Sequence, residues 1–131
     1  MNSVVHFEIP ADDMNRAETF YSKVFNCEIQ AMPEMNYTIV RTAPSDPQTH
    51  MLKEPGAING GMMQRTERVT GPVITLRVKD IKQACEDVKK AGGDVVTEPW
   101  SIGEMGFAAY FKDTEGNVLG LWQDKPQPVA P

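Results

Sequence analysis

Residues 4–25, VVHFEIPADDMNRAETFYSKVF, indicate a strand that runs directly into an amphipathic helix. Side chains alternate between the two faces of a strand, so Phe7 and Ile9 point one way while His6 and Glu8 point the other. The helix is expected to cover the apolar side. His6 and Glu8 therefore lie on the face away from the helix, and they are the candidate catalytic residues.

The start and end of this helix can be predicted from local chemistry. Pro10 has no backbone donor and is expected to end the pairing of the strand. Asp12 or Asp13 then offers a side-chain oxygen to the first free amides of the helix. Asn26 suits a left-handed helix end. The apolar side chains between these limits predict a single buried stripe: Ala17, Phe20, Tyr21, Val24 and Phe25.

The whole chain has 131 residues, a net charge of −5 and a pI near 5.0. This charge argues against nucleic acid as a partner, because phosphate binding requires clustered Lys and Arg. No apolar run approaches the ~20 residues of a membrane helix, so no membrane partner is expected. The first residues lack a signal-peptide pattern, which favours a cytoplasmic location. Cys27 and Cys85 have no metal-like spacing, and both are expected to be reduced.

The remaining segments continue the pattern of strands and one more helix. Asp80 is expected to cap the second helix, whose buried stripe is Ile81, Ala84, Cys85 and Val88. Pro99 is expected to halt a strand that begins at Asp94. The Pro-rich residues 125–131 are expected to form a loose extension. The other strands are expected at 27–32, 37–42, 57–64, 73–78, 106–112 and 118–123.

The two halves of the chain repeat each other. A shift of 67 positions aligns Asp13 with Asp80 and Ala17 with Ala84, and the segment GMMQ at 61–64 matches GLWQ at 120–123. Such a repeat constrains the fold strongly. It predicts an α+β fold in which two βαβββ modules pair into a cup-shaped mixed sheet with the helices outside. We expect one domain over 1–124, with modules at about 4–65 and about 72–124.

The interior of this cup is the candidate ligand site. Strand alternation places Thr75 and Trp122 on the same side of the second module as Gly120. Met62 is expected to join them, because flexible thioethers suit loosely specified apolar ligands. His6 titrates near neutral pH, and Glu8 is placed to orient it as a general base. Thr75, Trp122 and Met62 are therefore the predicted ligand-binding residues.

The segments HFEIPADD, INGGMM and FKDTEGNVLGLWQ resemble the vicinal oxygen chelate superfamily, which includes glyoxalase I, bleomycin-resistance proteins and extradiol dioxygenases. The resemblance runs from about Val4 to Gln123. It implies paired βαβββ modules and, commonly, a homodimer. In the metal-dependent members it also implies a divalent ion held by the first and last strands of each module.

The four metal-ligand positions implied by the resemblance are His6, Gly60 or its neighbour Gly61, Val73 and Gly120. Only His6 carries a donor, whereas catalytic metal sites usually have three protein ligands. We therefore expect no metal at this position and no cofactor. A divalent metal could still be held if Glu8 and His50 joined His6. Side chains added at Val73 and Gly120 are expected to be tolerated, because both positions should face a cavity.

Three functions remain open at this point. The first is a metal-independent family member that binds a small, largely apolar molecule in the cavity, with or without chemistry. The second is a metal-dependent enzyme like lactoylglutathione lyase, which would act on the thiol adduct of an α-ketoaldehyde. The third is a protein that sequesters an antibiotic, for which the negative net charge favours a cationic drug.

Overall fold

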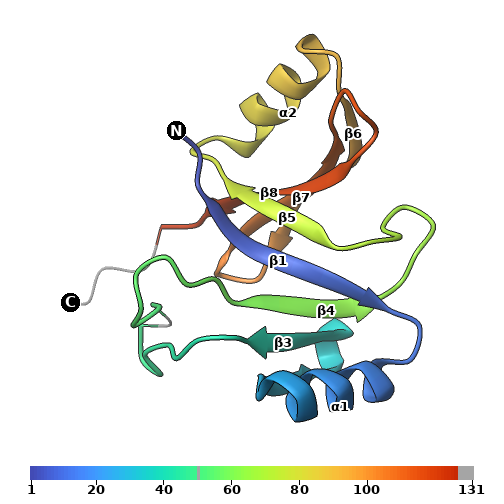
Figure 1. Cartoon of the computed structure of the whole chain (residues 1–131). Helices are drawn as coiled ribbons and strands as arrows, with labels where there is room; N and C mark the ends of the chain where they lie inside the picture. Colours follow the sequence, from blue (N-terminus) through green and yellow to red (C-terminus); the bar gives the residue numbers. More distant parts are fainter. Residues whose placement is uncertain (50, 127–131) are drawn as a thin grey trace. The chain divides into compact units, whose positions relative to one another are not determined.

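The computed structural model describes residues 1–49 and 51–126 (Figure 1). It divides into two compact units, one of residues 5–72 and the other of residues 1–4 together with the chain from 73 onward. The first half carries β1 (Val4–Ala11), α1 (Met14–Phe25), β2 (Glu28–Met32), the 3₁₀ turn η1 (Pro33–Met35), β3 (Tyr37–Arg41) and β4 (Gly60–Gln64). The second half carries β5 (Val73–Arg77), α2 (Ile81–Lys90), β6 (Asp94–Ile102), β7 (Gly106–Lys112) and β8 (Val118–Asp124).

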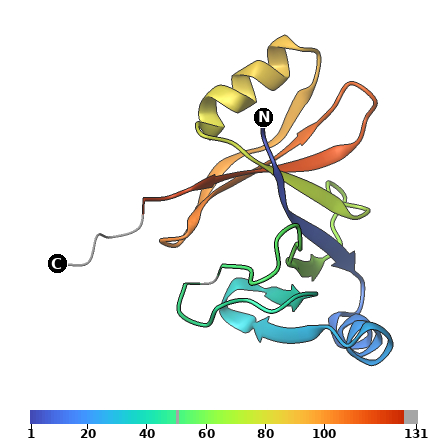
Figure 2. The ribbon, with the colours of Figure 1, turned by 60° about the vertical axis from the view of Figure 1, so that its left-hand side comes forward.

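The strands of the first module follow the order β2-β3-β4-β1. β1 pairs with β4 in parallel, and the two other pairs are antiparallel. A parallel neighbour requires a crossover, which α1 and the β2–β3 hairpin provide. The second module has the same plan, with β5 parallel to β8 and the order β5-β8-β7-β6. Figure 2 shows α2 lying along the strands of its own module.

The helix caps repeat between the modules. Asp13 caps α1 by accepting from the amide of Arg16 at 3.0 Å, and Asp80 caps α2 by accepting from the amide of Gln83 at 3.0 Å. Asn26 ends α1 in the left-handed conformation with φ of 57°. These findings confirm the predicted caps, and among the two candidates for the first cap they select Asp13.

The last strand of each module is tied to the start of its helix by a glutamine. The Gln64 side chain donates to the carbonyl of Asp12 at 3.0 Å. In the second module, Oε1 of Gln123 accepts from the amide of Ile81 at 2.8 Å, which satisfies a free donor in the first turn of α2. The repeat seen in GMMQ and GLWQ therefore has a structural basis.

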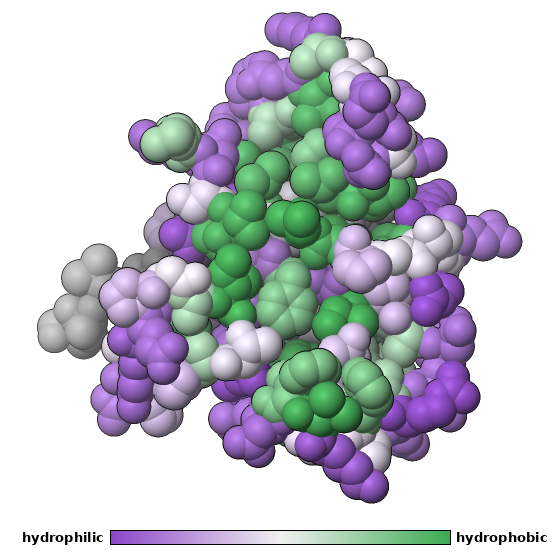
Figure 3. Space-filling view, in the orientation of Figure 1, coloured by the Kyte–Doolittle hydropathy of each residue, from purple (hydrophilic) through white to green (hydrophobic). Residues whose placement is uncertain are grey.

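The core beneath α1 differs from the predicted stripe. Ala17 and Tyr21 pack on the buried residues Ala11, Val40 and Met62, as predicted. Phe20, Val24 and Phe25 are instead 52%, 57% and 63% exposed, so this part of the prediction is wrong. Figure 3 shows apolar side chains gathered on the outer surface of α1.

Two contacts at α1 explain this difference. Met14 packs against the core, one turn before Ala17. The Thr38 hydroxyl of β3 donates to the Glu18 carboxylate at 2.7 Å, which places Glu18 toward the sheet. The face toward the sheet thus runs along Met14, Ala17, Glu18 and Tyr21, and the exposed aromatic residues lie outside it.

The core beneath α2 matches its prediction. Ile81 and Cys85 are buried with Val78, Phe111 and Leu121, and Ala84 and Val88 pack against them. Here the three-and-four spacing identified the buried face correctly.

Two prolines do not end their strands, in contrast to the prediction. Pro10 lies within β1, in register with Met63 of β4. The amide of Arg65 donates to the carbonyl of Ala11. Because neighbouring residues direct their backbone groups to opposite edges, the missing donor of Pro10 lies away from β4. Pro99 lies in β6, the last strand of the order, where the pairing with β7 shifts between Thr97 and Trp100. A bulge at an edge tolerates proline.

Lys125, the first residue of the expected loose extension, is tied to the β6–β7 hairpin. Its amide donates to the carbonyl of Met105, and its ammonium group donates to the carbonyl of Gly103 at 2.6 Å. The ammonium group also lies 4.6 Å from the centre of the Phe107 ring. The prediction is therefore wrong for Lys125, and residues 127–131 lie outside the described part of the chain.

Within residues 1–49 and 51–126, eight strands and two α-helices make an α+β fold with a mixed sheet, which confirms the predicted class. Across the residues that the structure describes, no helix is long and apolar enough to cross a membrane.

Candidate functional site

The candidate site lies on the sheet face of the first module opposite α1. Phe7 packs toward the α1 core, so alternation places its neighbours His6 and Glu8 on the other face. The register of β1 with β4 and of β4 with β3 adds further residues to this face. We call it the His6 face, and it comprises His6 and Glu8 on β1, Gly61 and Met63 on β4, and Tyr37 and Ile39 on β3.

A hydrogen bond joins His6 to a residue 31 positions later in the chain. Nε2 of His6 lies 2.8 Å from the hydroxyl of Tyr37. Tyr37 was not among the predicted site residues, and the structure makes it the partner of His6. The sequence held no signal for this contact.

Tyr37 reaches His6 by crossing Gly61. On β4, Gly61 lies beside both Glu8 of β1 and Ile39 of β3, whereas Tyr37 lies beside Met63. A Cβ atom at Gly61 would overlap the phenolic oxygen of Tyr37. The missing side chain at Gly61 is thus the space through which the Tyr37 ring extends.

Gly60 lies on the other face of the sheet, the face that packs against α1. A Cβ atom there would lie 2.5 Å from a ring carbon of Phe7. Gly60 therefore accommodates Phe7 beneath α1, and it does not share a face with His6. Of the two candidate positions for the second family ligand, Gly61 is the one on the His6 face, so the assignment of this position to Gly60 is wrong.

The electrostatic setting of His6 favours a neutral imidazole at pH 7. Burial lowers the pKa of the His6 imidazole from its ordinary value of 6.5, and the negative charge of Glu8 opposes part of this change. A neutral imidazole has one donor and one acceptor nitrogen, so Nε2 can either donate to Tyr37 or accept from it.

Met62 lies away from the predicted ligand site. Its side chain is fully buried and packs with Val40 and Ala11 beneath α1. Met62 is in register with Ile9, which has the opposite parity to His6 and Glu8. The prediction of Met62 as a ligand-binding residue is therefore wrong, and Met63 is the methionine on the His6 face.

In the second module, Thr75, Gly120 and Trp122 share one sheet face. Thr75 is in register with Gly120, and Arg77 is in register with Trp122. Oγ1 of Thr75 lies 2.5 Å from the position that a Cβ atom of Gly120 would occupy. The predicted face is correct, but the space beside Gly120 is already taken by Thr75. The expectation that a side chain at Gly120 would be tolerated is therefore wrong.

Trp122 is held by a charged pair on the same face. Its indole N–H donates to Asp124 at 2.7 Å, and Asp124 also pairs with Nε of Arg77 at 3.1 Å. On β6 and β7 the rings of Trp100 and Tyr110 lie 5.5 Å apart. Trp122 is thus fixed by its own module, and its role in ligand binding stays a prediction.

The described residues do not fit a divalent metal at the position implied by the resemblance. The His6 imidazole is hydrogen-bonded to Tyr37, and Gly61 has no space for a donor. Val73 has no lone pair, and Gly120 is filled by Thr75. Within 1–49 and 51–126, no three His, Cys, Asp or Glu side chains gather as a metal site would require. His50, the proposed third ligand, lies outside these ranges.

Two shallow hollows lie elsewhere in the modules. The first, of about 350 Å³, lies at the start of α1, and Arg65 on its wall pairs with Asp12 at 2.9 Å. The second, of about 320 Å³, is lined by residues 1–3 and by the Arg77–Asp124 pair. Neither of these two hollows includes His6, Glu8 or Tyr37.

Comparison with known proteins identifies the family. Residues 3–121 match the Glyoxalase/Bleomycin resistance protein/Dioxygenase superfamily, and the chain belongs to this superfamily. A glyoxylase-like domain-containing protein of Didymella fabae is 36% identical over 119 residues, which cover 87% of this chain and 88% of the relative. A probable lactoylglutathione lyase of Vibrio cholerae is 25% identical over 126 residues, with 93% and 91% covered.

Solved structures agree on the fold. A hypothetical protein of Bacillus halodurans superposes with a TM-score of 0.63 at 16% identity, covering 98% of this chain and 99% of its own. A methylmalonyl-CoA epimerase of Streptomyces coelicolor superposes with a TM-score of 0.64 at 15% identity, covering 100% and 99%. Identities this low establish the glyoxalase-type fold alone.

Proposed function

We propose that this protein binds a small, largely apolar molecule on the His6 face, with His6 and Glu8 as its polar anchors and without a metal at the family position. Ile39 and Met63 lie on the same face as Tyr37 and supply apolar surface there. A few polar groups set in an apolar surface are typical of small-molecule sites.

The observation that carries this proposal is the hydrogen bond between Nε2 of His6 and the Tyr37 hydroxyl. His6 is the only donor among the four metal-ligand positions that the resemblance implies, and this hydrogen bond occupies its Nε2 atom. The same hydroxyl fills the space beside Gly61, where a second ligand would have to project. A cation would therefore have to displace Tyr37, and the described residues at the family position would still supply fewer than three donors.

The alternative is a metal-dependent enzyme that resembles lactoylglutathione lyase. The relative from Vibrio cholerae, whose name carries this activity, favours it. This alternative requires a metal ion bound in equimolar amount and turnover of the thiol adduct of an α-ketoaldehyde.

Two measurements on the same preparation separate the proposals. The first is elemental analysis of protein purified without chelators, beside a His6→Gln variant, which keeps an amide group near the position of Nε2. The second is a thermal-shift screen against a library of small metabolites, repeated with added zinc, nickel and manganese.

The proposal predicts far less than one metal ion per chain in both proteins. It also predicts stabilisation by apolar library members that does not depend on metal and is reduced in His6→Gln. Equimolar metal that is lost in His6→Gln, together with lyase turnover, would overturn it in favour of the enzyme. A library without any stabilising member would overturn ligand binding itself.

A further inference from the structure

We propose that Asn59–Gly60 is a site of spontaneous deamidation that is protected by the hydrogen bonds of the Asn59 side chain, and that the isoaspartate formed there disrupts the candidate site at Gly61. The chain has six asparagines, and only Asn59 is followed by glycine. An Asn–Gly pair is reactive because glycine has no Cβ atom, so its backbone nitrogen is unhindered and its dihedral angles are unrestricted. The modification does not depend on the ligand that the His6 face binds.

The Asn59 side chain joins the end of β3 to the start of β4. Its Oδ1 atom accepts from the amide of Thr42 at 2.8 Å and from the amide of Ala43 at 3.0 Å. Its Nδ2 atom donates to the carbonyl of Ala43 at 3.1 Å. Both partners follow the last residue of β3, so the side chain satisfies backbone groups that leave the sheet there. This contact requires an acceptor and a donor together, which an amide side chain offers.

Glycine at position 60 is required for a different reason. Gly60 lies between Phe7 of β1 and Val40 of β3 in the register of the sheet. A Cβ atom at Gly60 would lie 2.3 Å from the carbonyl oxygen of Phe7, which is a backbone atom and cannot turn aside. Two separate structural demands therefore place a reactive Asn–Gly pair at the start of β4.

Deamidation proceeds through a succinimide ring. The backbone nitrogen of Gly60 attacks Cγ of Asn59, so that a new C–N bond forms and the bond from Cγ to Nδ2 breaks. Ammonia leaves with the proton that the Gly60 nitrogen has lost. Water then opens the ring at either of its two carbonyl groups, which gives aspartate or isoaspartate. The overall change exchanges ammonia for water, and it needs no other reactant.

The native structure opposes ring closure at both reacting groups. Cγ is attacked from above the plane of the carboxamide, and three hydrogen bonds fix that plane. Gly60 is buried between its two neighbouring strands, which shields its nitrogen from the base that must remove the proton. Reaction therefore requires local opening of the loop before β4. The Thr42 hydroxyl opposes the same opening, because it donates to the carbonyl of Ile58 at 2.6 Å.

The two products differ in their effect on the sheet. Aspartate keeps an acceptor for the two amides, but it turns a second oxygen toward the Ala43 carbonyl in place of the donor. Isoaspartate adds one methylene group to the main chain directly before Gly60. Gly61 follows, and its missing side chain is the space that the Tyr37 hydroxyl occupies. The longer main chain displaces Gly61 from its register with β1 and β3, and it thereby disturbs the contact between Tyr37 and His6.

The test follows Asn59 by peptide mass spectrometry, with isoaspartate identified by enzymatic methylation of its carboxylate. The full chain is incubated at neutral pH in the native state and, in parallel, unfolded in guanidinium chloride. Thr42→Val removes the hydroxyl bonded to Ile58 and keeps the backbone amide of residue 42. The matched control is Thr19→Val, which removes an exposed hydroxyl bonded to the carbonyl of Asn15 on α1.

In the unfolded chain we expect Asn59 to react faster than the other five asparagines. In the native protein its rate should fall by at least about 10-fold, because opening breaks three neutral hydrogen bonds. Thr42→Val should speed the native reaction by about 3- to 10-fold, as the loss of one such bond predicts, and leave the unfolded rate unchanged. Thr19→Val should change neither rate.

The effect on the candidate site is read from the His6 imidazole signal in the NMR spectrum, assigned with His6→Gln. Protein separated as the isoaspartate form should show a shifted signal. Asn59→Asp reproduces the other product, and it should keep the signal close to that of the unmodified protein. An unchanged signal in the isoaspartate form would overturn the link between Asn59 and the candidate site.

Equal rates at Asn59 in the native and unfolded chains would overturn the protection by hydrogen bonds, and this comparison needs no variant. Faster reaction of another asparagine in the unfolded chain would overturn the assignment of the site. Equal effects of Thr42→Val and Thr19→Val on the native rate would show that opening of this loop does not limit the reaction. Ligand binding on the His6 face is decided separately by the metabolite library.

Discussion

The phenolic oxygen of Tyr37 occupies the space that a side chain at Gly61 would need. The two residues lie on adjacent strands, yet they are not direct neighbours in the register, because Tyr37 is opposite Met63. The Tyr37 ring therefore crosses the sheet diagonally on its way to His6. Gly61 stands at a position where the family resemblance implies a metal ligand. Its missing side chain leaves the space that the Tyr37 hydroxyl occupies.

Substitution of Gly61 by Ala should destabilise the protein by about 1–3 kcal/mol, because the added methyl group overpacks the site and displaces Tyr37. Gly71→Ala is the matched control, with no atom within 4 Å of the new Cβ and no positive φ. It should change stability by less than about 1 kcal/mol. Urea unfolding measures both values. Equal effects at the two glycines would mean that Tyr37 does not lie over Gly61.

The pKa of His6 makes stability depend on pH in a defined direction. Burial lowers this pKa in the folded protein, whereas the unfolded chain keeps the ordinary value of about 6.5. Between these two values the unfolded state binds more protons, so the free energy of unfolding falls as the pH drops below about 6.5. It levels off below the folded pKa. Urea unfolding across this range should show the slope, and His6→Gln should remove it.

Glu8 opposes the effect of burial on His6, so Glu8→Gln should lower the pKa of His6 further. The titration of the imidazole by NMR checks this, with His6→Gln assigning the signal. A rise of this pKa in Glu8→Gln would mean that the carboxylate does not act on His6.

The fold could be predicted from the sequence because several local signals agree. Alternation predicted the strands, and the caps at Asp13 and Asp80 predicted the helix starts. Together with the repeat, these signals predicted two βαβββ modules. The failures came where a local rule depends on the partner strand. Pro10 lies inside β1 because its missing donor is directed away from β4. Pro99 lies inside β6 because it falls at a bulge in the pairing with β7. The exposure of Phe20 likewise depends on Glu18 of α1, which accepts a hydrogen bond from Thr38 on β3.

The candidate site could be predicted only in part. Alternation placed His6 and Glu8 on one face of the first module, and it placed Thr75 with Trp122 on one face of the second. It did not reveal Tyr37, because that contact depends on the register of three strands and on the direction of a side chain. Met62 was assigned to the ligand site only because its thioether is flexible, and that property does not define a face. The face of each β4 residue follows from the pairing of β4 with β1.

Gly120 should be as sensitive to substitution as Gly61. A Cβ atom at Gly120 would lie 2.5 Å from Oγ1 of Thr75, whose β-branched side chain has few alternative rotamers. Gly120→Ala should therefore cost about 1–3 kcal/mol. Adding Thr75→Ala removes the hydroxyl and should recover at least 1 kcal/mol of that loss, a typical coupling for residues in contact. Additive effects in the double-mutant cycle would show that the two side chains do not meet.

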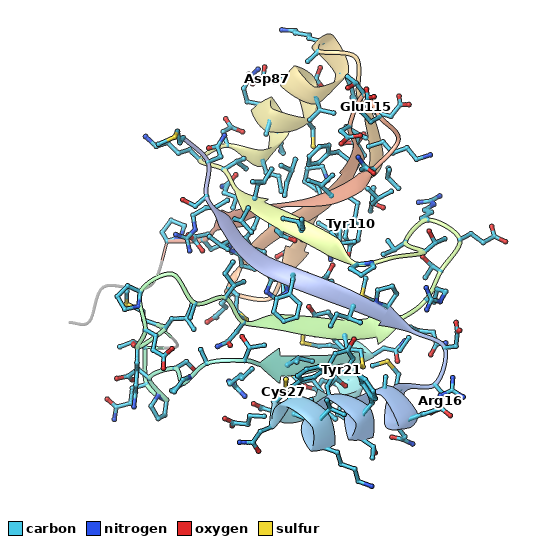
Figure 4. The ribbon with its side chains drawn as sticks, viewed as in Figure 1. Arg16, Tyr21, Cys27, Asp87, Tyr110 and Glu115 are labelled. Carbon is cyan, nitrogen blue, oxygen red and sulfur yellow. The ribbon has the colours of Figure 1, made fainter. Side chains whose placement is uncertain are left out.

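The two cysteines should differ in their reaction with iodoacetamide. Cys85 is 2% exposed beneath α2, and burial, followed by the charge of Glu98, raises the pKa of its thiol. Cys27 lies beside Tyr21 at the end of α1 and is half-buried (Figure 4).

Because the thiolate is the reactive form, the native protein should be alkylated at Cys27 first. Cys85 should react only as α2 opens, so its rate should rise steeply as urea approaches the unfolding midpoint, whereas the rate at Cys27 should rise much less. Mass spectrometry of peptides after timed labelling measures both rates. Faster labelling of Cys85 in the native protein would contradict the packing of α2 on its sheet, because a thiol in that core is shielded from the reagent and held in its protonated form.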